Sequence, residues 1–247
     1  IVEDPGMVGI VAPRTTFEAG DGVADDQFAF VDSLHPALAV HEAWGAFNAR
    51  ALAGADSAAL DDSANIAAYG GGAQMVMGFG GDDRLSLGNG HDIGLGGTGA
   101  DRIGGQRGRD LLSGGADDDT LLGGRGRDLL DGGPADDRLV GGRGRDLITD
   151  GLGADIMRGG RGADTFVFVD PSLIGGDAPE GDTIVGGRGA DQLVLVLAED
   201  PGSTDTETLL SDRGLILRGV ETVTVVVGRD ALDSALDGVP GASDADL

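Results

Sequence analysis

The chain has 247 residues, a formal net charge of −26 at pH 7, no cysteine and 4% aromatic residues. This negative charge opposes binding to nucleic acid or to an anionic membrane as the main role. The absence of cysteine excludes a disulfide framework and thiolate zinc sites. No stretch approaches the roughly 18 apolar residues of a membrane-spanning helix, so no membrane span is expected.

The N-terminal residues 1–68 are expected to form a cap segment. Short β-like runs at 8–11 and 28–31 are separated by Gly, Pro and Asp turns. Residues 36–68 are rich in alanine and carry large apolar residues at helix-compatible spacings, which predicts two short helices. Because solenoids need capped ends, this segment would cover one end of the repeats that follow.

Residues 78–167 consist of ten consecutive blocks of nine residues, and each block has an aspartate at its sixth position. A fixed period of this kind indicates a repeat architecture in which each block is one structural unit. Nine of the ten blocks also have an apolar eighth residue, which predicts a short strand over positions 7 to 9 with the eighth side chain turned inward. Glycines at positions 1, 2 and 4 permit a tight turn before that strand. Turns in which Phe79, Gln106, Asp117 or Ala135 replaces such a glycine are expected to be strained.

The repeated aspartates point to bound cations. Carboxylates beside uncovered backbone carbonyls are hard oxygen ligands, which favour Ca²⁺ or Mg²⁺ over transition metals. The many carbonyls favour Ca²⁺, which accepts about six to eight oxygens in adaptable geometry. Without the ion the stacked carboxylates would repel, so each ion would add binding energy only to the folded state. The ten aspartates are Asp83, Asp92, Asp101, Asp110, Asp119, Asp128, Asp137, Asp146, Asp155 and Asp164.

The blocks, of which GGRGRDLLD (123–131) is among the fullest, resemble the GGxGxDxUx repeat of the RTX, or hemolysin-type calcium-binding, family. The resemblance covers 78–167 and resumes at 186–194. It implies a mainly β fold: a right-handed parallel β-roll over 69–197, in which two blocks make one turn. It also implies type I secretion, with the chain unfolded in the calcium-poor cytosol and folded outside, so we expect a secreted, extracellular or cell-surface protein.

In that family calcium lies between loops one turn apart, so ligands pair at i and i+18. About eight ions are therefore expected, four on each edge. A ninth pair would join Asp164 to Asp182, and Asp191 completes the expected metal ligands. Residues 168–185 have Leu173 where an aspartate belongs, which predicts an outward loop. The eight pairs are Asp83/Asp101, Asp101/Asp119, Asp119/Asp137 and Asp137/Asp155 on one edge, and Asp92/Asp110, Asp110/Asp128, Asp128/Asp146 and Asp146/Asp164 on the other.

The C-terminal part of the chain is expected to close the roll. Runs at 192–197, 214–220 and 222–227 have the β-branched and apolar composition of strands. Residues 229–247 are small and polar, and the last of them resemble the C-terminal secretion signal of type I substrates. We therefore expect 198–247 to contain capping strands and a tail.

Alternate blocks differ in charge, which predicts two unlike edges of the roll. One edge presents arginines, and the other adds acidic residues at Asp82, Asp117, Asp118 and Asp136. The arginines would meet an anionic surface, such as the acidic edge of another copy, or would bridge carboxylates within the molecule or be solvated. These candidate partner-binding arginines are Arg107, Arg109, Arg125, Arg127, Arg143 and Arg145.

The seventh position of the arginine-bearing blocks is apolar and is expected to face outward as a stripe on one sheet. A contiguous exposed apolar patch generally marks an interaction site. Either flanking segments of the chain or another molecule would cover it. The candidate stripe residues are Ile93, Leu111, Leu129 and Leu147.

The sequence shows no catalytic motif, so we expect no enzyme. His41-Glu42 lacks the second histidine of an HExxH helix, and no GxSxG elbow occurs. The preferred hypothesis is a structural, self-associating extracellular subunit, such as a filament, surface-layer or matrix protein. Two alternatives remain: a C-terminal export and folding module of a secreted enzyme, toxin or adhesin, and a binder of anionic polysaccharide through the arginine edge.

Overall fold

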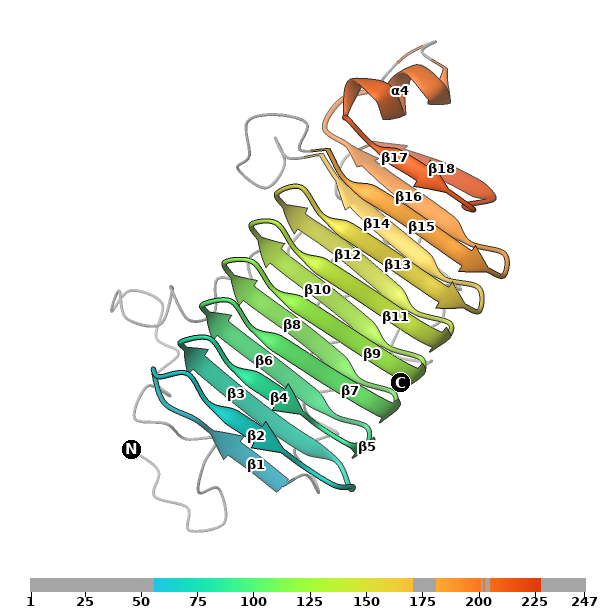
Figure 1. Cartoon of the computed structure of the whole chain (residues 1–247). Helices are drawn as coiled ribbons and strands as arrows, with labels where there is room; N and C mark the ends of the chain where they lie inside the picture. Colours follow the sequence, from blue (N-terminus) through green and yellow to red (C-terminus); the bar gives the residue numbers. More distant parts are fainter. Residues whose placement is uncertain (1–55, 171–180, 201, 203–204, 228–247) are drawn as a thin grey trace.

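The computed structural model describes residues 56–170, 181–200, 202 and 205–227. This part of the chain forms a parallel β-solenoid of two sheets with one short helix (Figure 1). Strands alternate between the sheets, so each coil contributes one strand to each, and the coils stack along the long axis. The expected mainly β, parallel β-roll fold is confirmed.

The first sheet, sheet A, contains nine strands and every one of its pairs is parallel. Its order follows the chain. The strands are β1 (Asp56–Ala59), β3 (Gln74–Gly80), β6 (Ile93–Thr98), β8 (Leu111–Ala116), β10 (Leu129–Pro134), β12 (Leu147–Leu152), β14 (Thr165–Val169), β16 (Gln192–Leu197) and β18 (Thr222–Val227).

The second sheet, sheet B, takes the intervening strands, again in chain order and with parallel pairs. The short β5 lies off the main path and pairs with β7. The strands are β2 (Ile66–Ala68), β4 (Arg84–Ser86), β5 (Asn89–Gly90), β7 (Arg102–Gly108), β9 (Thr120–Gly126), β11 (Arg138–Gly144), β13 (Ile156–Arg161), β15 (Thr183–Arg188) and β17 (Ile216–Arg218).

The register places equivalent positions of the repeat on top of one another. Leu129 in β10 pairs with Leu111 in β8 and with Leu147 in β12, each 18 residues away. Two nine-residue blocks therefore make one coil, as expected. Parallel stacking at about 4.8 Å per coil turns each sequence position into a column along the roll.

The core is the column of eighth-position side chains between the two sheets. These residues of the repeat are at most 3% exposed. In the block with Gly94 at this position, the Leu87 side chain occupies the space that an eighth-position side chain would fill. A Cβ on Gly94 would lie only 2.9 Å from it. The column consists of Leu85, Ile103, Leu112, Leu121, Leu130, Leu139, Ile148, Met157 and Phe166.

The turns show the backbone strain expected from the missing glycines. Among the described residues, the non-glycine residues with positive φ are Phe79, Gln106, Asp117 and Ala135, at φ of 73° to 99°. Each replaces a glycine in a position where the repeat turns through a conformation that side chains disfavour. The four substitutions named from the sequence are therefore confirmed as strained positions.

The N-terminal side of the roll corrects part of the helix prediction. The end of the alanine-rich segment is strand, not helix: β1 pairs with β3 and β2 with β4, in the same register as later coils. Pairing with the adjacent coil overrides the helix propensity of alanine here. The predicted β-like runs and the helices before residue 56 lie outside the described residues.

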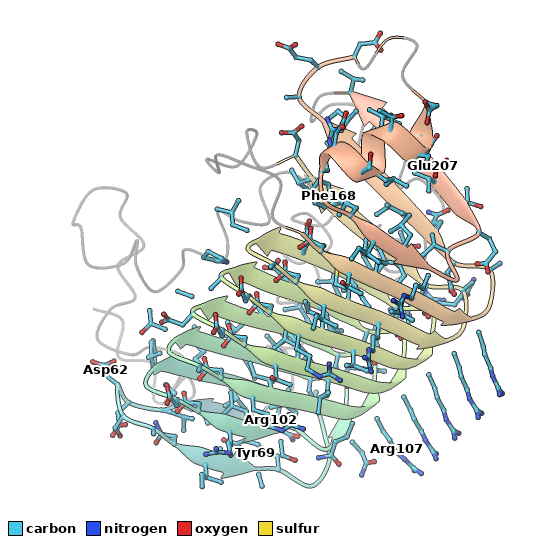
Figure 2. All side chains as sticks on the ribbon, turned by 45° about the horizontal axis from the view of Figure 1, so that its top comes forward. Asp62, Tyr69, Arg102, Arg107, Phe168 and Glu207 are labelled. Atoms are coloured by element: carbon cyan, nitrogen blue, oxygen red, sulfur yellow. The ribbon has the colours of Figure 1, made fainter. Side chains whose placement is uncertain are left out.

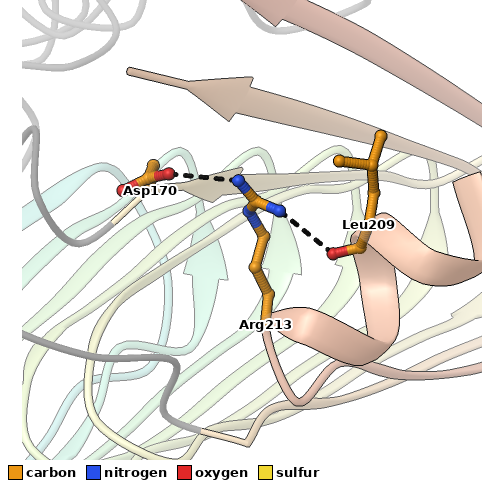
Figure 3. A network of polar contacts seen from close by, with 3 residues as sticks. All are labelled: Asp170, Leu209 and Arg213. Atoms are coloured by element: carbon orange, nitrogen blue, oxygen red, sulfur yellow. Dashed lines mark hydrogen bonds and ion pairs between the residues drawn. The ribbon is translucent and has the colours of Figure 1, made fainter. Parts of the chain in front are cut away.

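At the C-terminal side, β16, β17 and β18 confirm the three predicted strands. A helix that the sequence reading missed, α4 (Thr206–Asp212), lies between β16 and β17 and buries Leu209 against the core. Its end is held by Arg213, which donates to the carbonyl of Leu209 at 3.1 Å and pairs with Asp170 at 3.4 Å (Figure 3). Most of the predicted loop at 168–185 and all of the predicted tail at 229–247 lie outside the described residues. The segment boundaries at 68/69 and 197/198 stay predictions.

No helix in the described part of the chain is both long and apolar enough to cross a membrane.

Candidate calcium sites

The sixth-position aspartates form two continuous ladders, one on each edge of the roll. In both, the Oδ1 atom of each aspartate accepts a hydrogen bond from the backbone N–H of the residue one coil earlier, which is Asn65 for Asp83, Gln74 for Asp92 and an aspartate for every later member. The first ladder lies where sheet A turns into sheet B, and the second where sheet B turns into sheet A. The first contains Asp83, Asp101, Asp119, Asp137, Asp155 and Asp182, with N–O distances of 2.7 to 2.8 Å. The second contains Asp92, Asp110, Asp128, Asp146, Asp164 and Asp191, at 2.9 to 3.0 Å.

The last link of each ladder corrects the sequence prediction. Asp164 does not pair with Asp182. Instead Asp155 pairs with Asp182, and Asp164 with Asp191, both 27 residues apart. One extra block length of chain lies between β14 and β15, so the i+18 rule becomes i+27 there. The eight pairs expected within 78–167 are brought together as predicted.

The ladder bonds use one oxygen of each carboxylate and leave the other facing the turn. The Oδ2 atom is buried and accepts no hydrogen bond in Asp83, Asp92, Asp101, Asp110, Asp119, Asp128, Asp137, Asp146, Asp164 and Asp191. A buried oxygen of this kind usually has a partner. Its repetition in nearly every coil indicates a shared ligand.

The space beside these oxygens is lined by backbone carbonyls. A Cβ added to Gly96 would collide with Asp101 Oδ2 and with the carbonyl oxygen of Gly114, one coil later. On the other edge, a Cβ on Gly123 would collide in the same way with Asp128 Oδ2 and would lie 2.8 Å from the carbonyl oxygen of Gly141. The first-position glycine therefore keeps open a cradle of carboxylate and carbonyl oxygens, which is the donor set that fits Ca²⁺.

Each cradle relies on the backbone as well as on carboxylates. In the described part of the chain, no three His, Cys, Asp or Glu side chains gather closely enough to hold a metal by themselves. A cation would thus sit between carboxylates of adjacent coils and take its remaining ligands from carbonyls. This arrangement requires two stacked coils, so binding and folding are coupled.

Burial makes the charged form of the ladder costly without a cation. Desolvation, reinforced by carboxylates in neighbouring coils, raises the pKa of Asp137 to about 10 and those of Asp119 and Asp128 to about 8, from 3.8. The pKa values fall towards the ends of the ladders, to about 6 for Asp92 and Asp164, because those carboxylates are less deeply buried. The backbone N–H bonds lower the pKa values but do not offset desolvation.

The structure places two further carboxylates at the candidate sites that were not predicted from the sequence. Glu221 Oε2 accepts a 2.7 Å bond from the N–H of Asp191, so a glutamate continues the second ladder beyond the last aspartate. Asp150 occupies a first position that is glycine in most blocks, and it is buried with Oδ1 unbonded. Burial, then the nearby Asp182 and Asp155, raises the pKa of Asp150 well above 3.8. Only the block register, which gives a carboxylate at a glycine position, could have marked it.

The candidate arginine surface is partly as predicted. Arg107, Arg125 and Arg143 are exposed and are register partners across β7, β9 and β11. Arg109 and Arg127 are half-buried and have interactions of their own, whereas Arg145 is exposed. The third position of the repeat is therefore the exposed arginine column.

The candidate apolar stripe is not an exposed surface. Ile93, Leu111, Leu129 and Leu147 are 0%, 2%, 8% and 1% exposed, whereas Ile156 at the same repeat position of sheet B is 39% exposed. The stripe that the sequence predicts is therefore already buried within the single chain, so of the two kinds of cover expected, another molecule is not required. A stripe already buried offers no surface to a partner.

A comparison with protein-family models agrees with this geometry. The model for the RTX calcium-binding nonapeptide repeat matches residues 95–130, 131–166 and 180–194. These segments are RTX calcium-binding repeats. No curated protein and no solved structure gives a significant match to the chain.

Proposed function

We propose that the protein is a secreted structural subunit that folds on binding calcium outside the cell. The observation that carries this proposal is the pair of buried carboxylate ladders with open oxygen cradles. Bound Ca²⁺ would neutralise the ladders and allow the coils to stack. The buried carboxylates of the two ladders are explained as cation ligands, so no catalytic role needs to be assigned to them.

The coupling of calcium to folding supports secretion. A ligand that binds only the folded state stabilises it in proportion to the logarithm of its concentration. Cytosolic calcium would leave the ladders unneutralised and the chain unfolded, and the higher calcium outside the cell would drive folding there. An extended chain is suited to export through a narrow channel, as the type I secretion implied by RTX repeats requires.

Circular dichroism and small-angle X-ray scattering of the whole chain test the proposal. With millimolar calcium we expect a β-rich spectrum and an elongated particle. With EDTA we expect loss of both. Magnesium at the same concentration is the control, because it requires stricter octahedral geometry and retains its waters. An unchanged spectrum and melting curve after metal removal, with no metal in elemental analysis, would contradict the proposal.

Self-association is a second step that a specific feature favours. Among the described strands, β18 is the last of sheet A and pairs with β16 alone. Its sequence is rich in valine, and Val227 is 40% exposed. An apolar strand edge of this kind is a template for pairing with another chain. Because the two ends of the roll differ, end-to-end pairing would be heterologous and would produce a filament.

Light scattering in calcium tests this step separately. We expect particles longer than one chain, and Val227→Asp should disperse them because it adds a charge beside the strand edge. Ile156→Asp is the matched control, since Ile156 is equally exposed at 39% but lies on the outer face of sheet B. A monodisperse monomer in the unmodified protein would refute self-association and leave calcium-dependent folding intact.

A further inference from the structure

The edge between sheet B and sheet A carries an uninterrupted column of arginines. We call this set, Arg107, Arg125, Arg143, Arg161 and Arg188, the arginine ladder. Each member is exposed and is the register partner of the next, although the last step crosses the extra chain length before β15. Figure 2 shows Arg107 at one end of a row of parallel side chains that point away from the roll. One guanidinium per coil gives a spacing of about 4.8 Å.

The arginine ladder borders an open groove. The groove has a volume of about 780 Å³, and its floor includes Gly124, Gly142 and Gly160 from three adjacent coils. These glycines have no side chains to obstruct a ligand, so a narrow chain could approach the backbone. Because the groove runs across successive coils and is open to solvent, its shape suits a linear polymer better than an enclosed small molecule.

Within the described part of the chain, the arginine ladder has no ion-pair partner. Like charges stacked in adjacent strands are unfavourable without a partner. The third position on the opposite edge carries no arginine: it is uncharged in five successive coils, with Gly80, Thr98, Ala116, Pro134 and Leu152, and the next coil has Asp170 there. Five stacked cations in a chain of net charge −26 therefore call for an external anion.

The regular spacing selects a class of anion. The acidic edge of a second copy fits poorly, because its fifth-position column Asp82, Asp118 and Asp136 is interrupted by Ala100 and ends at Ala154. Its carboxylates also already accept backbone N–H bonds, as Asp118 does from Asp136 at 3.1 Å. B-form DNA presents a phosphate about every 3.4 Å along each strand, which does not match the coil spacing. A sugar ring with its glycosidic oxygen spans about one coil.

We infer that the arginine ladder binds a linear acidic polysaccharide, with one carboxylate or sulfate per sugar facing one guanidinium per coil. A guanidinium can bind such a group through two parallel N–H bonds, which a lysine ammonium cannot do. Three more exposed arginines on the outer face of sheet B, Arg84, Arg102 and Arg138, make this side of the roll the basic one. This inference goes beyond the structural role and requires only that the roll is folded.

Isothermal titration of the full chain in calcium, with oligogalacturonates too short to gel, tests the inference. Affinity should increase with oligomer length until about five sugars and then level off, because five arginines span about 19 Å at this coil spacing. Affinity should also fall as salt is added, because exposed charges are screened. Neutral dextran of similar length should not bind. Affinity that is independent of length would overturn the inference.

The matched variants separate the arginine ladder from general charge. Replacing Arg125, Arg143 and Arg161 with alanine should weaken binding by about tenfold or more. The control replaces Arg84, Arg102 and Arg138, which removes the same charge from the sheet face, and should change binding much less. Arg→Lys at the three ladder positions should also weaken binding, because the bidentate contact is lost. Circular dichroism in calcium confirms that every variant folds.

The remaining outcomes each oppose the inference. Equal loss in both alanine variants would mean that only net charge matters. Binding of single-stranded DNA as tight as that of the oligogalacturonate would refute the assignment to a polysaccharide. Loss of self-association in the ladder variant, without any oligogalacturonate binding by the unmodified protein, would assign the arginines to a second copy instead. None of these results alters the test of calcium-dependent folding.

Discussion

Asp137 Oδ1 accepts a 2.7 Å hydrogen bond from the backbone N–H of Asp119, one coil before it, and the same bond recurs along both edges of the roll. The bond aligns adjacent turns and turns the second carboxylate oxygen towards the carbonyl-lined cradle. One side chain thereby links coil stacking to cation binding. The predictions below follow from that link.

Removing the charge of one central ladder residue should raise the calcium concentration needed for folding. Asp128→Asn keeps the size and the Oδ1 acceptor but removes the negative charge that a cation would bind. We expect a loss of about 2 kcal/mol in calcium, the scale of one hydrogen bond to a charged group. Calcium titration followed by circular dichroism measures it. Asp212→Asn, an exposed change in α4, is the control and should leave the midpoint unchanged.

Acid should stabilise the roll when metal is absent. Burial raises the pKa values of Asp92, Asp119, Asp128 and Asp137 to about 6 to 10 from 3.8, so the folded state binds more protons than the unfolded chain. The stability that comes from these extra bound protons is complete below pH 3.8, and it is lost as the pH rises through the folded-state pKa values of about 6 to 10. Protein stripped of metal should therefore show more β structure at pH 5 than at pH 8.

The calcium-loaded protein provides the control for the pH experiment, because protons compete with the ion for the same oxygens. Its stability should fall on acidification. If metal-free protein gains no structure between pH 8 and pH 5, the carboxylates are not buried as the structure shows.

Close packing of the turns makes fourth-position glycines indispensable on the arginine edge. A Cβ on Gly126 would overlap the carbonyl oxygen of Gly108 in the adjacent coil, and its φ is 144°. Gly126→Ala should therefore cost more than about 3 kcal/mol, since both strain and a steric clash oppose stacking. Gly104→Ala is the matched control: its Cβ would lie 4.0 Å from the carbonyl oxygen of Leu85, so the unfolding midpoint in urea should shift little. Similar shifts in the two variants would argue against this coil packing.

Burial of the apolar stripe predicts a stability effect in place of a binding effect. Leu111→Ala should destabilise the calcium-loaded protein by about 2 to 5 kcal/mol, as for other buried leucines. Ile156→Ala, at the same repeat position but 39% exposed, should cost about 1 kcal/mol or less. Equal and small effects in thermal unfolding would show that sheet A is open on its outer face.

The ion pair beside α4 should stabilise only the C-terminal coils. Arg213→Ala removes the contacts with Asp170 and with the carbonyl of Leu209. Because both side chains are about one-fifth exposed, we expect a loss near 1 kcal/mol. Hydrogen exchange should report faster opening of β16 to β18 and unchanged protection of β8 to β12. Arg218→Ala, an exposed arginine in β17, serves as the control.

Much of the repeat could be read from the sequence because its information is local. The nine-residue period, the aspartate at the sixth position and the inward apolar residue at the eighth together dictate a tight turn, a short strand and a carboxylate at their junction. The ladder links within 78–167, the core column and the strained turns follow from that period. Helix α4 carried no such period and was missed.

Other features were decided by the tertiary structure alone. They depend on which coils stack on one another and on which faces of the sheets are covered, and no local sequence pattern encodes either. The extra block length before β15 changes the partner of Asp164 from Asp182 to Asp191. Glu221 can continue the second ladder because the chain returns to it after α4. The stripe containing Leu111 is buried within the single chain, whereas alternation within a strand defines only which side of the sheet a residue faces and not whether that side is covered.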